Sequence, residues 1–122
     1  MKELYKLVNA ELDTCGFTCK ITNNPPLEIT EFPIVIFKVN NRMDYSLINQ
    51  KANITIDVFT KEEGIETVEN MVDIIDRKFN RQNYNMDYIS CITYRQTIWN
   101  LNLDEGENNV KHRQLKYYAD LY

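Results

Sequence analysis

The segment "ITIDVFTKEEGIETVENMVDIIDRKF" changes its hydrophobic period within a few residues, and no other feature constrains the fold as much. Up to Thr60 apolar and polar residues alternate, so Ile54, Ile56 and Val58 share one face of a predicted strand. Further along, apolar residues recur every three or four positions, which predicts a helix that buries one stripe. The stripe consists of Ile65, Val68, Val72, Ile75 and Phe79. A strand that leads directly into an amphipathic helix is therefore the expected centre of the domain.

The junction between this strand and this helix carries a capping signature. Thr60 is followed three residues later by Glu63. In such a capping box the two side chains satisfy backbone N–H groups that have no partner at a helix N-terminus. We therefore expect the helix to begin directly after Thr60.

The N-terminal elements follow from the same two periods. A helix is predicted from Lys2 to Cys15 and ends at Gly16. The alternating "FTCKIT" predicts a strand, which stops at "NNPP" because proline donates no hydrogen bond to a sheet. The almost continuously apolar "FPIVIFKVN" predicts an interior strand, and a polar loop from Asn40 to Gln50 follows it.

The C-terminal part is predicted to be mostly strand. After Phe79, "NRQNYN" predicts a turn, and "MDYISCITYRQTIWNL" predicts one long strand or two short ones, bent near Arg95 to Thr97. An acidic turn, "NLDEGENN", precedes a closing strand in "KHRQLKYYADLY". The order α-β-β-β-α-β-β in one domain over residues 1–122 predicts an α+β fold. We expect a mostly antiparallel sheet of four to five strands with two helices packed on one face.

Composition restricts the classes of function. The 122 residues include 14 basic and 18 acidic side chains, so no positive field favours binding to nucleic acid or anionic lipid. No apolar run approaches the roughly 20 residues that cross a bilayer, and "MKELYKLVNAELDTCG" lacks the apolar centre of a signal peptide. Three cysteines, an odd number, favour reduced thiols. We expect a protein of the cytosol that does not associate with membranes.

The thiols and the single histidine permit two kinds of site on paper. Cys15, Cys19, Cys91 and His112 contain the ligand types of a Cys3His zinc site, but the second closely spaced ligand pair is missing. Cys91 with His112 would form a nucleophilic dyad only if the fold brought them together. Core packing is the favoured interpretation for the cysteines, so no metal or other cofactor is expected.

The carboxylates permit a metal-dependent hydrolase or nuclease as an alternative. Such an enzyme would place a strand aspartate near a second acid and a lysine. Asp57 lies on a predicted strand, but the triplet of Asp76, Arg77 and Lys78 falls on a predicted helix. Asp57 is therefore interpreted as part of the solvated face of its strand.

Two sets of residues are candidates for surfaces. The second predicted helix carries an acidic row in a narrow angular band: Glu62, Glu66, Glu69, Asp73 and Asp76. This row is either a solvated helix face or, in a ring-forming protein, the lining of a channel through which DNA slides without binding. Tyrosine and tryptophan are favoured in protein interfaces, and the aromatic and apolar candidates are Ile98, Trp99, Leu101, Tyr118 and Tyr122.

The whole layout resembles the tail terminator, or tail completion and neck, proteins of long-tailed bacteriophages and prophages. The similar parts are the N-terminal helix, "FPIVIFKV" after a proline, "ITIDVFT" running into an amphipathic helix, and the closing "HRQLKYYADLY". The resemblance implies a non-enzymatic virion protein, assembled in the bacterial cytoplasm. It would form a ring, commonly a hexamer, that ends the tail tube, contacts tail-tube and head-connector proteins, and lets DNA pass without specific binding.

The expected contacts of such a ring come from position in the chain alone. The loop from Asn40 to Gln50, with Arg42, Asp44 and Tyr45, and the turn from Asn102 to Asn109 are the candidates. Three other interpretations remain open at this point. They are another position in the same assembly, such as head closure, a small hydrolase or nuclease, and an adaptor that binds one partner as a monomer.

Overall fold

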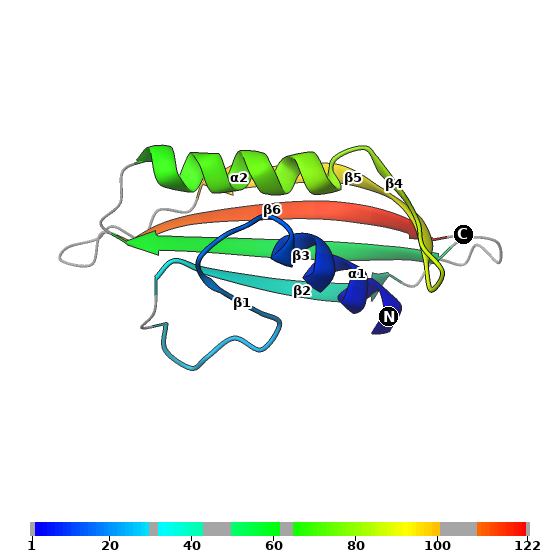
Figure 1. Ribbon diagram of the computed structural model, residues 1–122, viewed down its shortest axis with the longest axis horizontal. Helices are drawn as coiled ribbons and strands as arrows, with labels where there is room; N and C mark the ends of the chain where they lie inside the picture. The colour runs from blue at the N-terminus through cyan, green and yellow to red at the C-terminus, as the bar shows by residue number, and fades with distance from the viewer. Residues whose placement is uncertain (1, 30–31, 43–49, 62–64, 101–109, 122) are drawn as a thin grey trace.

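The computed structural model describes residues 2–29, 32–42, 50–61, 65–100 and 110–121 (Figure 1). Two helices and six strands follow one another in the order α1 (Lys2–Asp13), β1 (Lys20–Thr22), β2 (Ile34–Arg42), β3 (Gln50–Lys61), α2 (Ile65–Phe79), β4 (Gln82–Asn85), β5 (Ser90–Asn100) and β6 (Val110–Leu121).

All six strands form one sheet in the order β1-β2-β3-β6-β5-β4. Among the described strands β1 and β2 pair in parallel, and every other neighbouring pair is antiparallel. The predicted α+β class is confirmed, and the sheet has six strands instead of four to five. The additional strand is β4, which lies within the segment predicted as a turn. It is polar and shows no alternation of apolar residues, and its pairing with β5 through Tyr84 and Cys91 makes it a strand.

Helix α1 buries the predicted stripe and ends at Asp13, two residues before the predicted end at Cys15. Leu4, Leu7, Val8 and Leu12 are fully buried, which is the stripe that a period of 3.6 residues requires. After Asp13 the chain turns through Gly16, whose φ of 78° lies in the left-handed region that glycine adopts without a steric penalty.

Helix α2 buries the predicted stripe from Val68 onwards but does not begin where the capping box places it, and the side chain of Ile65 lies outside the described residues. Val68, Val72, Ile75 and Phe79 are buried, and Met71 joins them. Thr60 belongs to β3 and is buried, because β3 continues to Lys61 through pairing with β6. Thr60 therefore cannot cap the helix, and Glu63 lies outside the described residues.

Several strands begin or end at other residues than predicted, because pairing with a neighbouring strand sets their ends. Of the predicted "FTCKIT" strand, the part from Lys20 to Thr22 pairs with β2, and Phe17 and Cys19 pack against the core outside any strand. β2 and β3 extend further into the predicted 40–50 loop than expected. β5 is one long strand with an irregular register between Arg95 and Thr97, where the bend was predicted.

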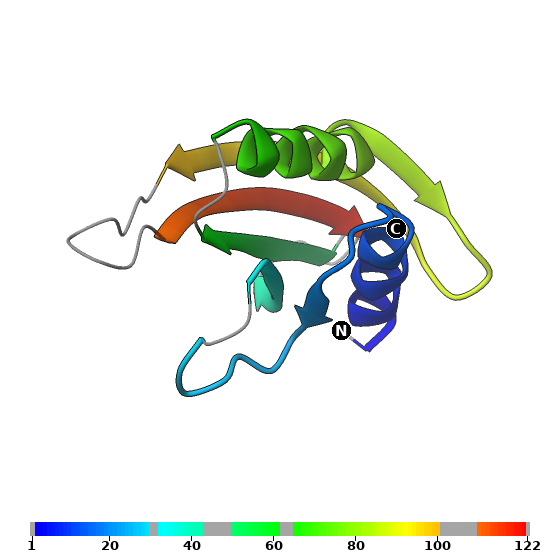
Figure 2. The same ribbon diagram turned by 60° about the vertical axis from the view of Figure 1, so that its left-hand side comes forward.

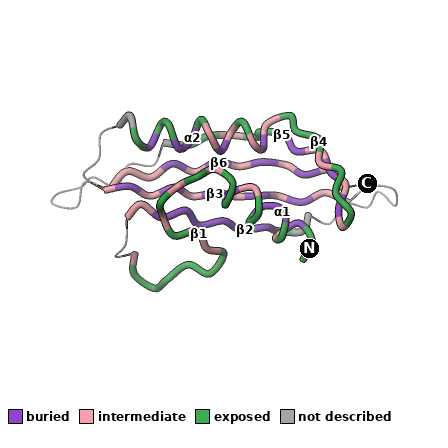
Figure 3. Tube along the Cα trace, in the orientation of Figure 1, coloured by how far each residue is buried: buried purple, intermediate pink, exposed green. Residues whose placement is uncertain are grey.

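Both helices lie on one face of the sheet, as predicted. α1 packs beside β1 and β2, whereas α2 runs along the strands and packs against β3, β6 and β5 (Figures 1 and 2). One hydrophobic cluster joins the helices to the inward residues of the strands, including Phe37, Ile56 and Leu115. Burial alternates along β3 and β6 (Figure 3). The alternate side chains therefore point to the opposite face, which neither α1 nor α2 covers, and we call this the open face.

Candidate functional site

Two described acids of the acidic row on α2 hold the helix against the sheet. The Glu69 carboxylate accepts a hydrogen bond from Nε of Arg113 at 2.8 Å, and Arg113 is buried on β6. Asp76 accepts one bond from the Tyr117 hydroxyl at 2.8 Å and another from Arg95 at 3.1 Å. These bonds join α2 to β5 and β6 at two points along the helix.

The rest of the acidic row is placed differently. Asp73 is exposed on the outer side of α2. The side chains of Glu62 and Glu66 lie outside the described part of the chain. The phenol of Tyr117, which donates to Asp76, is itself affected. Its burial, and secondly its hydrogen bond to Asp76, raise the pKa of the phenol well above its usual range.

A polar cluster on the open face contains both Asp57 and the single histidine. Oδ1 of Asp57 lies 2.7 Å from Nε2 of His112 and accepts a hydrogen bond from Gln114 at 3.1 Å. The His112 ring stacks on Phe59, with 4.1 Å between the ring centroids. Asp57 lies on the face of β3 opposite the core, as predicted, but His112 and Gln114 on the neighbouring strand cover most of its side chain, which is 14% exposed. An ordered Asp–His pair of this kind fixes the orientation of the imidazole.

The structure does not bring Cys91 and His112 together. Cys91 pairs with Leu121 at one end of β6 and faces the core, whereas His112 pairs with Phe59 near the other end and faces outward. Burial raises the pKa of the Cys91 thiol to about 11, so the thiol is protonated at neutral pH and is a weak nucleophile.

The other two cysteines have similar chemistry. Burial also raises the pKa values of Cys15 and Cys19, which are partly buried. Protonated thiols are poor ligands as well as poor nucleophiles. Within the described ranges, no group of three or more His, Cys, Asp or Glu side chains is arranged to hold a metal ion.

The second half of β5 exposes large apolar side chains. Ile98 and Trp99 are among the predicted interface residues, and both are exposed, as is Tyr94. Tyr94 was not singled out in the sequence, although its strand alternates apolar and polar residues. Tyr118 lies opposite Tyr94 on the open face, where the two tyrosines line a hollow of about 160 Å³ with Lys51 and Asp120.

The other predicted interface residues give less information. Arg42 is the last residue of β2, and its side chain is outside the described residues. Asp44, Tyr45, Leu101 and Tyr122, and the turn from 102 to 109, also lie outside them.

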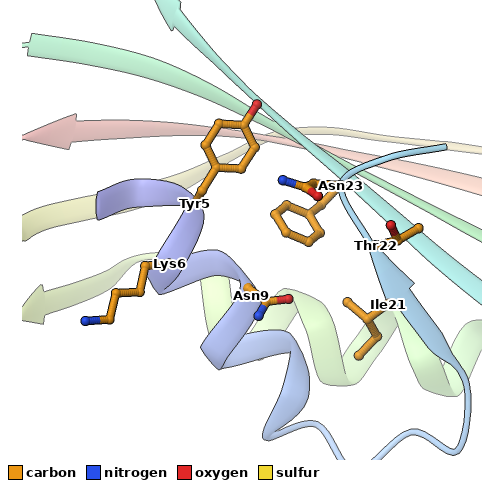
Figure 4. Close-up of a pocket in the computed structure, with 7 residues that line it drawn as sticks. Tyr5, Lys6, Asn9, Ile21, Thr22 and Asn23 are labelled. Atoms are coloured by element: carbon orange, nitrogen blue, oxygen red, sulfur yellow. The ribbon is translucent and has the colours of Figure 1, made fainter. Parts of the chain in front are cut away.

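A second hollow, of about 320 Å³, lies between α1 and the short β1 strand (Figure 4). Its position depends on contacts between segments far apart in the chain, which sequence patterns do not reveal. The Tyr5 hydroxyl donates to the Val39 carbonyl at 3.1 Å, and the Lys6 ammonium lies 4.3 Å from the centre of the Tyr88 ring. The residues that line this hollow are Tyr5, Lys6, Asn9, Ile21, Thr22, Asn23 and Phe37.

Comparison with known proteins gives a likeness of fold. No protein-family model matches the chain, and no curated protein matches it. Among solved structures, a chain from the virion of a native gene transfer agent particle is similar, with a TM-score of 0.69. The match covers 93% of this chain and 90% of that chain at 11% sequence identity. The two chains therefore share a fold over nearly their whole lengths.

In the part of the chain that the structure describes, neither helix is long and apolar enough to cross a membrane.

Proposed function

We propose that this protein is a structural component of a phage-like virion, a tail terminator that forms a ring at the head-proximal end of the tail tube. The observation that carries the proposal is the likeness of fold to a virion chain, which extends over 93% of one chain and 90% of the other. It agrees with the resemblance of the element order to phage tail terminators. In this role the protein ends the tube, joins it to the head and transforms no substrate.

The surface chemistry supports an assembly role. Exposed apolar side chains gather on β5 at one edge of the sheet, where Trp99 is 52% exposed. Aromatic residues of this kind are enriched in the buried centres of protein interfaces. The ring, commonly a hexamer in the family that the sequence resembles, would contact the tail tube on one side and the head connector on the other, with DNA passing through its centre.

Some acids of the acidic row have partners within the molecule, which bears on the proposal that the row lines a channel. Glu69 and Asp76 are bonded to Arg113, Tyr117 and Arg95, so part of their charge is neutralised within the molecule. Asp73 is exposed. If α2 faces the channel, this residue contributes the repulsion that keeps DNA from binding.

The experiment that tests the proposal measures assembly directly. Sedimentation velocity over a hundredfold range of concentration would be combined with electron microscopy of tail tubes from the same particle, with and without the protein. We expect rings, and tubes capped at one end. A chain that stays monomeric and leaves the tubes uncapped would overturn the proposal and favour the monomeric adaptor.

The enzyme alternative has its own test. Asp57→Asn removes the carboxylate that a metal-dependent nuclease or hydrolase would need. The proposal expects Asp57→Asn to assemble as the unchanged protein does, with no nuclease activity on linear DNA in either. A magnesium-dependent cleavage that disappears in Asp57→Asn would contradict it.

A further inference from the structure

Two neighbouring exposed residues on β5 point to opposite faces of the sheet. Ile98 pairs with Leu115, which belongs to the core face, and Trp99 pairs with Gln114, which belongs to the open face. A partner that lies flat on either face would cover one of these side chains and leave the other in water. A partner that buries both must sit at the edge of the sheet.

The described chain places no strand on that edge beyond Thr93. β4 pairs with β5 from Ser90 to Thr93, and Asn80 then accepts a hydrogen bond from the backbone N–H of Arg95 at 3.2 Å. The register of β5 against β6 shifts between Arg95 and Thr97, and from Thr97 to Asn100 β5 pairs with β6 on its inner side. An edge of this kind presents backbone N–H and C=O groups that pair with an added strand.

The opposite edge of the same sheet carries the segment Phe17–Thr22. Its sequence predicts a longer strand than the one that forms there. Phe17, Cys19 and Ile21 alternate with polar residues, yet the strand at this edge, β1, includes only Lys20–Thr22. A strand added on the free side of β1 would offer backbone hydrogen bonds to this segment.

The directions of the strands make these two edges compatible. β1 runs parallel to β2, and three successive antiparallel pairings separate β2 from β5, so β5 runs opposite to β1. A second copy placed beside the first in the same orientation therefore brings its β1 next to β5 in the antiparallel sense.

We propose that the outer edge of β5, from Gln96 to Asn100, accepts the Phe17–Thr22 segment of a second copy as an added antiparallel strand. The inference rests on the proposed function, because it requires that the chain assembles with itself. It buries Ile98 and Trp99 together and lengthens β1. The donor and acceptor surfaces are different, so the contact is head-to-tail and repeats from copy to copy, as closure into a ring requires.

Photo-cross-linking tests which segments meet. The photoreactive residue p-benzoylphenylalanine would replace Ile98, and in a matched control it would replace Met86, which is equally exposed at 39% but lies on the β4–β5 turn. Mixing isotopically labelled and unlabelled chains identifies cross-links between copies. We expect position 98, and not position 86, to cross-link to a peptide containing Phe17–Thr22 of another copy.

A charged substitution at the edge tests the energetics. Ile98→Lys places a cation at the strand edge, a device by which natural edge strands avoid pairing. Because Ile98 is exposed in the single chain, we expect its thermal unfolding midpoint to change little while self-association weakens at least tenfold. Met86→Lys should associate as the unchanged protein does.

The outcomes separate this inference from the proposed function. Rings that form with cross-links elsewhere and with no effect of Ile98→Lys would overturn the strand addition and leave the tail-terminator role standing. A chain that stays monomeric with its tail tubes would overturn both. Cross-links to Phe17–Thr22 together with weakened association of Ile98→Lys would support both.

Discussion

Asp76 offers a sharp test of how α2 is attached to the sheet. Its carboxylate accepts hydrogen bonds from Tyr117, which is fully buried, and from Arg95, which is largely exposed. Asp76→Ala would leave the Tyr117 hydroxyl buried without its partner, which costs about 1–3 kcal/mol. The exposed ion pair with Arg95 adds about 0.2–1 kcal/mol at most. Since Asp76 itself is 19% exposed and water can enter in its place, we expect a total loss of about 2 kcal/mol.

A double-mutant cycle isolates the bond between Asp76 and Tyr117. Tyr117→Phe removes the hydroxyl and keeps the ring that packs against Phe79. We expect the two changes together to cost less than the sum of the single changes, with a coupling of about 1–2 kcal/mol. Asp73→Ala is the matched control, because Asp73 is an exposed acid on the same helix, and it should change stability by less than about 0.5 kcal/mol.

The assay is urea unfolding followed by circular dichroism at two protein concentrations, so that any contribution from self-association is visible. The reasoning would be refuted if Asp76→Ala were as mild as Asp73→Ala, or if the effects of Asp76→Ala and Tyr117→Phe were additive. Either result would mean that the bond between Asp76 and Tyr117 does not hold this part of α2 against the sheet.

Three further predictions concern the core and the thiols. Ile75→Ala removes a fully buried side chain of the α2 stripe and should lower the free energy of unfolding by about 2–4 kcal/mol, whereas Thr67→Ala on the exposed side of α2 should have little effect; equal values would mean that the wrong face is assigned to the core. Ellman's reagent should modify Cys15 and Cys19 before Cys91, which is fully buried, and a Cys91 that reacts first in the folded protein would contradict the packing. The pKa of Cys91 is raised in the folded state from 9.0 to about 11, so the unfolded chain releases this proton at lower pH, and stability should fall between about pH 9 and pH 11; in Cys91→Ala the fall over this range should be shallower, and an identical slope in chemical denaturation would refute the assignment.

The elements that sequence predicts well are those whose signal is local. The alternation around Ile54 and the three-and-four spacing around Ile75 each identify their element and its buried face without reference to the rest of the chain. The bend near Arg95 is also local, because it interrupts the alternation within one strand, and it appears as a shift of register.

The elements that sequence misses depend on partners elsewhere in the chain. β4 is a polar segment whose strand conformation comes from pairing with β5. Thr60 has the spacing of a helix cap, but pairing with Lys111 on β6 keeps it in β3. Tertiary pairing overrides local preference in both cases.

The acidic row shows the same limit at the candidate site. Angular spacing places Glu69 and Asp76 in one band, but their partners Arg113 and Tyr117 are 44 and 41 residues away along the chain. Nothing in the spacing of the acids distinguishes these two from Asp73. Ile98 and Trp99 are both exposed, and two apolar neighbours on one strand cannot both face the same core. Their place in an interface stays a prediction.

The bonds of α2 also indicate which parts of the molecule are available to partners. Glu69 and Asp76 are committed to β6 and β5, so that a partner that binds this side of α2 must compete with contacts the chain already makes. The β5 edge has no such commitment among the described residues beyond Arg95, and its exposed Ile98 and Trp99 gain burial from any strand that pairs there. Attachment of the helix layer and association through the sheet edge therefore rest on separate groups, and substitutions at Asp76 and at Ile98 should affect separate properties.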